Sequence, residues 1–142
     1  MYRKILVALE NGRADQSLLP HIAQLAQQLG SQLLLVHVAD GWAARNYVRL
    51  KLAESEEMQQ DRRYLDDCAE KLRAAGLTVA ARLALGDPPR EIVRIAAEEN
   101  CDLIAMTTHG HRLLADLFFG STIHEVRHNS PIPVLLVRAG RE

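Results

Sequence analysis

Five short apolar segments recur along this chain of 142 residues, and the stretches between them carry apolar residues at helical spacing. A short unbroken apolar run is typical of a strand covered on both faces, as the strands of a parallel sheet are. Strands that alternate with helices are joined by right-handed crossovers, which place helices on both faces of the sheet. The pattern therefore predicts an α/β fold with a doubly wound, five-stranded parallel sheet. The expected strands are residues 5–9, 33–38, 78–85, 103–106 and 132–137.

Turn and capping residues bound the expected helices. Apolar residues between positions 19 and 26 recur at helical spacing, and Gly30 follows as a C-terminal cap. A long amphipathic segment, residues 47–75, ends before a second glycine, and residues 90–99 follow a proline pair that suits a helix start. A short helix is expected to begin at Gly120, ahead of the last strand.

The length and composition favour one domain spanning residues 1–142. Aromatic residues make up only 4% of the chain, as expected of helices packed on a buried sheet. The formal net charge is −1 and the basic residues are scattered, so no nucleic-acid partner is expected. No apolar run reaches the roughly 18 residues of a membrane span, so we expect a cytoplasmic protein without a membrane partner. Cys68 and Cys101 lack metal-ligand spacing and are expected to be reduced thiols.

The most specific motif of the chain lies between Thr107 and Thr122. A turn ending in Gly110 follows an apolar strand, and nine residues later Gly120 and Ser121 open the expected helix. Glycines let the backbone approach a ligand, hydroxyls donate to phosphate oxygens, and free N–H groups at a helix start favour an anion. The motif predicts a phosphate cradle, although the same residues also suit an ordinary turn and an ordinary helix start. No Walker loop and no dinucleotide-binding glycine motif occurs in the sequence.

Strand order decides whether this motif lies at a ligand crevice. The expected order, 3-2-1-4-5, puts the reversal of winding between the first and fourth strands. The turn that begins at Glu10 and the turn from Thr107 to Gly110 would then meet beyond the carboxyl ends of these strands, where doubly wound folds bind ligands. Glu10 has a simpler alternative reading as a solvated acid or a helix cap.

The histidines do not predict a metal site. His109 and His111 are separated by a glycine, and His124 and His128 lack the glutamate of the zinc-binding helix motif. His37 lies inside an apolar strand and is interpreted as a hydrogen-bonded core histidine. No catalytic residue is assigned.

Three strand segments and the glycine motif together form a recognisable pattern. The segments are Ile-Leu-Val at 5–7, Val-His-Val at 36–38 and Pro-Val-Leu-Leu-Val at 133–137. With the glycine motif, these residues resemble the universal stress protein family over essentially the whole chain.

The family's ATP-binding branch has a glycine, two residues, a second glycine, nine residues, and a third glycine followed by serine or threonine. The matching positions here are Gly110, Gly120 and Ser121. Thr107 replaces the first glycine and adds a β-branched side chain where the family's backbone approaches the nucleotide. Ala8 replaces the usual proline, and Glu10 replaces the usual aspartate with a carboxylate one methylene longer.

The resemblance implies that the chain binds ATP, with or without magnesium. The residues it implies for the adenine and ribose end are Ala8, Leu9, Glu10 and Val38. Those implied beside the fourth strand are Met106, Thr107, His109 and Gly110, and those implied for the phosphates are Gly120, Ser121 and Thr122.

Three functions remain open from the sequence. The first is a dimeric stress-response switch or sensor that binds an adenine nucleotide and an unidentified protein partner. The second is a nucleotide-free dimeric scaffold, and the third is a slow ATP hydrolase that would have to use Glu10 or His109. The homodimer is implied by the resemblance, and it suits the edge strand from Ile132 to Val137.

Overall fold

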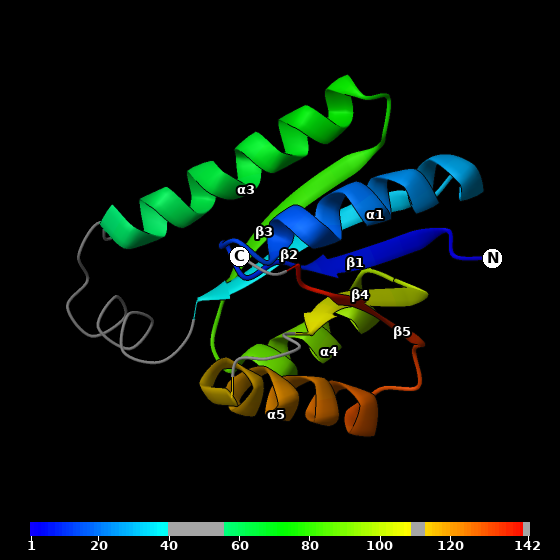
Figure 1. The fold of residues 1–142 in the computed structure, drawn as a ribbon. Coiled ribbons are helices and arrows are strands. Elements are labelled where there is room, and N and C mark those ends of the chain that lie inside the picture. Colours follow the sequence, from blue (N-terminus) through cyan, green and yellow to red (C-terminus); the bar gives the residue numbers. More distant parts are fainter. Residues whose placement is uncertain (40–55, 109–112, 141–142) are drawn as a thin grey trace.

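The computed structural model describes residues 1–39, 56–108 and 113–140, with the backbone alone for residues 113–120. Its five strands form one sheet in the order β3-β2-β1-β4-β5, and every neighbouring pair is parallel (Figure 1). The predicted fold class and strand order are therefore confirmed. The strands are β1 (Lys4–Ala8), β2 (Gln32–Ala39), β3 (Val79–Leu85), β4 (Leu103–Thr108) and β5 (Val134–Arg138).

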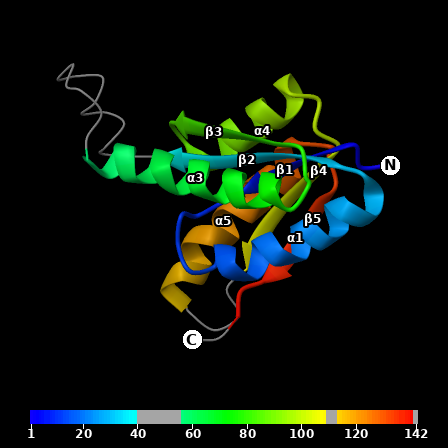
Figure 2. The ribbon, with the colours of Figure 1, turned by 90° about the horizontal axis from the view of Figure 1, so that it is seen from above.

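The helices of the described segments cover both faces of this sheet (Figure 2). Helices α1 (Asp15–Leu29) and α3 (Glu56–Ala74) lie on one face. Helices α4 (Pro88–Glu98) and α5 (Leu113–Asn129) lie on the other face. None of the described helices is long and apolar enough to cross a membrane.

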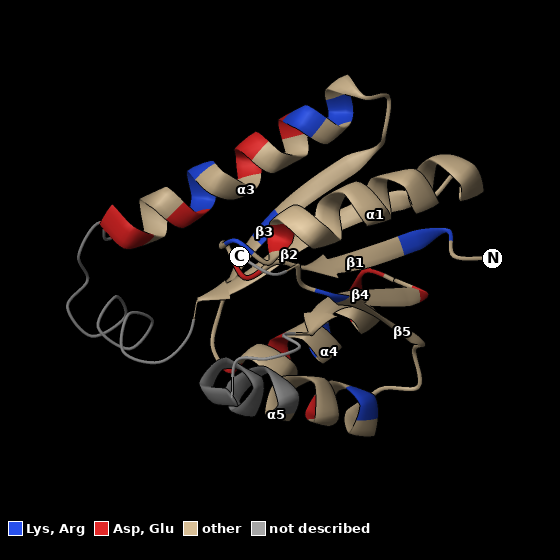
Figure 3. Cartoon of the chain, in the orientation of Figure 1, with Lys and Arg blue, Asp and Glu red and all other residues tan. Residues whose placement is uncertain are grey.

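Alternation along the central strands divides the core into two apolar layers. On β1, the side chains of Ile5 and Val7 join the layer under α1 and α3, while that of Leu6 joins the layer over α4 and α5. All three are fully buried, which explains why the sequence shows an unbroken apolar run instead of an alternating one. The charged residues lie mainly on the helices, most visibly along α3 (Figure 3).

Most element boundaries follow the expected turn chemistry. Gly30 adopts a left-handed conformation with φ of 69° and its N–H bonds to the carbonyl oxygen of Ala26, so the predicted helix end is confirmed. Helix α4 begins at Pro88, two positions before the expected start, because proline needs no N–H partner in the first turn. Residues 47–55 of the expected long helix lie outside the described residues.

The expected helix start at Gly120 is wrong. Helix α5 begins at Leu113, and Gly120 lies within it. Leucine and alanine at positions 113–117 are strong helix formers, and together they outweigh the preference of glycine and serine for a helix start. The backbone N–H of Gly120 is therefore not one of the free N–H groups in the first turn of the helix.

Candidate functional site

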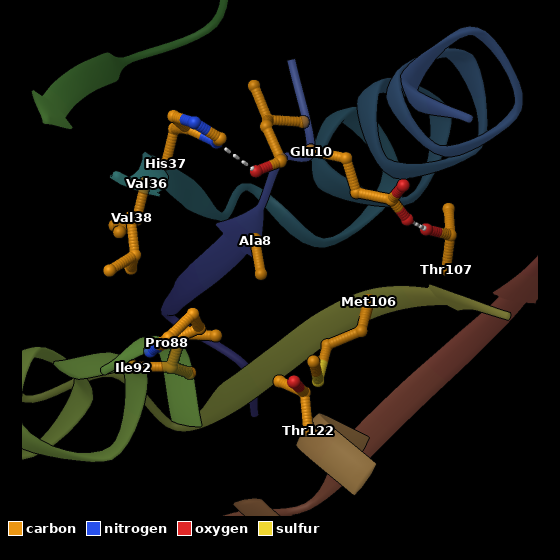
Figure 4. A pocket seen from close by; sticks show the side chains of 11 residues that line it. Ala8, Glu10, Val36, His37, Val38, Pro88, Ile92, Met106, Thr107 and Thr122 are labelled. Atoms are coloured by element: carbon orange, nitrogen blue, oxygen red, sulfur yellow. Dashed lines mark hydrogen bonds between the residues drawn. The ribbon is translucent and has the colours of Figure 1, made fainter. Parts of the chain in front are cut away.

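A pocket lies at the carboxyl edge of the sheet, where the winding reverses between β1 and β4 (Figure 4). Its volume is about 160 Å³, more than ten times what a single buried water needs, so the pocket has room for a ligand group. The lining residues are Ala8, Leu9, Glu10, Val36, His37, Val38, Pro88, Ile92, Met106, Thr107 and Thr122.

Apolar side chains from three elements form most of the pocket wall. Val36 and Val38 come from β2, Pro88 and Ile92 from the first turns of α4, and Met106 from β4. Such a wall favours a flat or apolar ligand group, while a few polar groups fix its orientation. The arrangement suits a ligand with an apolar ring at one end and hydrogen-bonding groups at the other.

The side chains of Glu10 and Thr107 are joined across the reversal point. The Thr107 hydroxyl, Oγ1, donates a hydrogen bond of 2.6 Å to Oε2 of Glu10. Thr107 is 3% exposed and Glu10 is half-buried. The bond links Thr107, near the end of β4, to Glu10, two residues beyond the end of the neighbouring strand β1, so it connects the two strands at the reversal point.

Asp15 holds the loop that carries Glu10. Its fully buried carboxylate accepts hydrogen bonds from the backbone N–H groups of Glu10 at 3.0 Å and of Gly12 at 3.3 Å. The hydroxyl of Tyr64 on α3 donates to the same carboxylate at 2.9 Å. Burial raises the pKa of Asp15 above its ordinary value, although these hydrogen bonds work in the opposite direction. Asp15 therefore fixes the backbone of the loop that carries Glu10 into the pocket.

His37 links the pocket to α3. Its Nδ1 donates to the backbone carbonyl of Leu9 at 2.8 Å, and its Nε2 lies 3.7 Å from Oδ2 of Asp61. The predicted hydrogen bond of His37 is confirmed, but the ring is half-buried and lines the pocket instead of lying in the core. The Asn11 side-chain amide donates to the Asp61 carboxylate at 3.1 Å, so α3 contacts this loop at several points.

The structure brings together most of the residues implied for nucleotide binding. Those on the pocket are Ala8, Leu9, Glu10, Val38, Met106, Thr107 and Thr122. Ser121 is exposed on α5 and does not line the pocket, and His109 and Gly110 lie outside the described residues. Their roles toward a ligand stay predictions.

Sequence reasoning missed several residues of the pocket region. Pro88 and Ile92 lie where the β3–α4 connection reaches the carboxyl edge of the sheet, which the expected strand order could have indicated. Val36 and His37 belong to the strand segment that precedes the implied residue Val38. Asp15 gave a weaker signal, because an acidic residue in a first helical turn is normally exposed.

The fold and the pocket define a doubly wound α/β protein with a pocket at the reversal of strand order. The profile of the Universal stress protein family matches residues 1–138, and the chain belongs to this family.

Similar proteins are known from bacteria and archaea. The universal stress protein in the QAH/OAS sulfhydrylase 3′ region of Thermus aquaticus is 33% identical over 144 residues, covering 97% of this chain and 100% of that protein. The universal stress protein MJ0577 of Methanocaldococcus jannaschii is 26% identical over 160 residues, covering 97% of this chain and 96% of its own. The solved structure of MJ0577 gives a TM-score of 0.81 and covers 100% of this chain and 99% of that one.

Two solved structures of universal stress proteins with bound nucleotides share the fold. The protein from Archaeoglobus fulgidus in complex with dAMP is 22% identical, with a TM-score of 0.70 and coverage of 96% of this chain and 98% of that chain. A universal stress protein in complex with cAMP is 18% identical, with a TM-score of 0.70 and coverage of 98% of both chains.

Proposed function

We propose that this protein binds an adenine nucleotide, ATP in the first instance, in the pocket between β1, β2 and β4. We further propose that nucleotide occupancy makes it a stress-response switch for a protein partner. One observation carries the proposal: residues implied for nucleotide binding, from four separate parts of the chain, converge on one pocket at the reversal point. The relatives that hold dAMP and cAMP support adenine as the base, because these two ligands share it.

The chemistry of the lining residues suggests how the ligand lies. The apolar wall formed by Val36, Val38 and Ile92 would hold the adenine ring. The Glu10 carboxylate would accept hydrogen bonds from the sugar hydroxyls, since it can only accept them when ionised. The phosphates would then extend toward α5 and the hydroxyl of Thr122, with magnesium as a counter-ion where it is present.

Calorimetric titration with ATP tests the proposal directly. We expect saturable binding with a micromolar Kd, and mass spectrometry of the fresh protein is expected to detect any adenine nucleotide that co-purifies. Micromolar affinity at millimolar ATP would raise the free energy of unfolding by about 4 kcal/mol, which a thermal melt detects readily. Absence of both binding and stabilisation at millimolar ATP would contradict the proposal and favour the scaffold reading.

We also propose that the protein forms a homodimer through β5. Within the described residues β5 is an edge strand, and Leu136 on it is 41% exposed. An exposed apolar strand edge favours pairing with a second copy. The cytoplasmic location expected from the sequence stays a prediction.

Leu136→Lys is expected to convert the dimer to a monomer, because a buried unpaired ammonium at the interface is costly. The mass in solution, measured by analytical ultracentrifugation at micromolar concentration, checks this. Leu29→Lys is the matched control, because Leu29 is a similarly exposed leucine (44%) that lies at the end of helix α1 and not on the edge strand. A wild-type protein that sediments as a 15.9 kDa monomer would rule the dimer out.

A further inference from the structure

The Glu10–Thr107 hydrogen bond lies at one end of the proposed nucleotide pocket. Both side chains line the pocket, and the 2.6 Å bond runs between them at the end away from Val38 (Figure 4). Thr107 is 3% exposed, so its hydroxyl has little access to bulk water as an alternative partner. The bond is therefore a feature of the pocket that a ligand must meet.

The chemistry of a carboxylate restricts what can replace this contact. An ionised carboxylate accepts hydrogen bonds and donates none. The Thr107 hydroxyl has one hydrogen to donate, and it donates this hydrogen to Oε2 of Glu10. A phosphate at this position would face a like charge, with the buried Asp15 carboxyl also close to the Glu10 backbone. A ligand group that takes over the contact must be a hydrogen-bond donor. With the adenine ring placed against the apolar wall near Val38, the sugar hydroxyls are the donors of a nucleotide that fit this position.

We propose that the Thr107 hydroxyl is a built-in competitor of the ligand's sugar hydroxyls for the Glu10 carboxylate. This inference rests on the proposed binding of an adenine nucleotide. Thr107 is then a specificity-determining residue, because its hydroxyl lowers the affinity for every ligand that must displace this hydroxyl from the Glu10 carboxylate. A ligand without sugar hydroxyls leaves the bond intact and is not penalised.

Two substitutions separate the hydroxyl of Thr107 from its bulk. Thr107→Val keeps the branched shape and removes the donor, whereas Thr107→Ser keeps the donor and removes a methyl group. The probes are ATP and 2′,3′-dideoxyATP, which lacks both sugar hydroxyls. Calorimetry with each probe gives the ratio of the two Kd values, and this ratio is insensitive to a general change in the stability of the variant.

We expect Thr107→Val to tighten ATP binding by about tenfold, since one displaced hydrogen bond is worth roughly one factor of ten, and to leave 2′,3′-dideoxyATP unchanged. Thr107→Ser is expected to keep the wild-type ratio. Adding Glu10→Gln to Thr107→Val should remove most of the gain for ATP, because the hydroxyls then meet one uncharged amide oxygen in place of the two oxygens of a charged carboxylate.

The possible outcomes distinguish this inference from the proposed function. Equal tightening of both probes by Thr107→Val would overturn the inference and assign the effect to packing. Weaker ATP binding by Thr107→Val would also overturn it, because the hydroxyl would then contact the ligand directly. If neither probe binds any variant at millimolar concentration, the proposed nucleotide function fails together with the inference.

Discussion

Replacing Asp15 by alanine is expected to lower the free energy of unfolding by about 3 kcal/mol, since three donors lose their buried acceptor. Two of these donors are the backbone N–H groups of Glu10 and Gly12, and the third is the hydroxyl of Tyr64. The loop after β1 would lose its link to Tyr64 on α3 as well as its internal support, while the hydrogen bond between Asn11 and Asp61 would remain. Urea unfolding followed by circular dichroism measures the change.

Asp15→Asn is the matched comparison. It preserves shape and one acceptor oxygen, removes the charge, and replaces the other oxygen by an NH2 group that cannot accept the hydrogen bond made there. Burial raises the pKa of Asp15 in the folded state. The folded protein therefore holds this proton to higher pH than the unfolded chain does, and the wild type loses stability as pH rises through this window. The asparagine variant cannot ionise at this position, so its stability relative to wild type should increase as pH rises above the ordinary value of 3.8 and then level off.

An equal loss in the alanine and asparagine variants would contradict this account of Asp15. The account also fails if the stability of the asparagine variant relative to wild type falls with rising pH, because the negative charge itself would then stabilise the loop.

The sheet was predictable because its central strands are covered on both faces. Leu6 and Val7 are both fully buried although they point to opposite layers, so the apolar run itself marks the strand. Gly30 was equally clear, since its φ of 69° suits glycine far better than other residues. In these places local chemistry and tertiary structure impose the same residue type, and a single sequence suffices.

The candidate site was predictable only where it follows from strand order. Glu10 and Thr107 are 97 positions apart, and the expected adjacency of β1 and β4 was enough to bring them together. Asp15 could not be predicted as a buried acceptor, because one of its donors, Tyr64, is 49 positions away on α3. The helix start predicted at Gly120 was wrong because glycine and serine suit a helix start locally. The helix formers that precede them extend α5 toward its N-terminus, to Leu113.

Filling the pocket from β1 is expected to abolish nucleotide binding without unfolding the protein. Ala8 lines the pocket at the end of β1 and is half-buried, so Ala8→Phe places a phenyl ring in the space proposed for the ligand. The ring would overlap the ligand, and we expect the affinity for ATP to fall by about 100-fold or more. The new side chain also buries apolar area against Val38 and Met106, so the melting temperature without nucleotide should be maintained.

Calorimetry with ATP and thermal melts in the presence and absence of nucleotide check both expectations. Ala97→Phe is the matched control, because Ala97 is exposed on α4 and does not line the pocket. That variant should bind ATP as the wild type does and show the same stabilisation by the nucleotide. If Ala8→Phe instead binds ATP with wild-type affinity, the nucleotide occupies another part of the protein. The convergence of the implied residues on this pocket would then reflect packing at the reversal point and not recognition of a ligand.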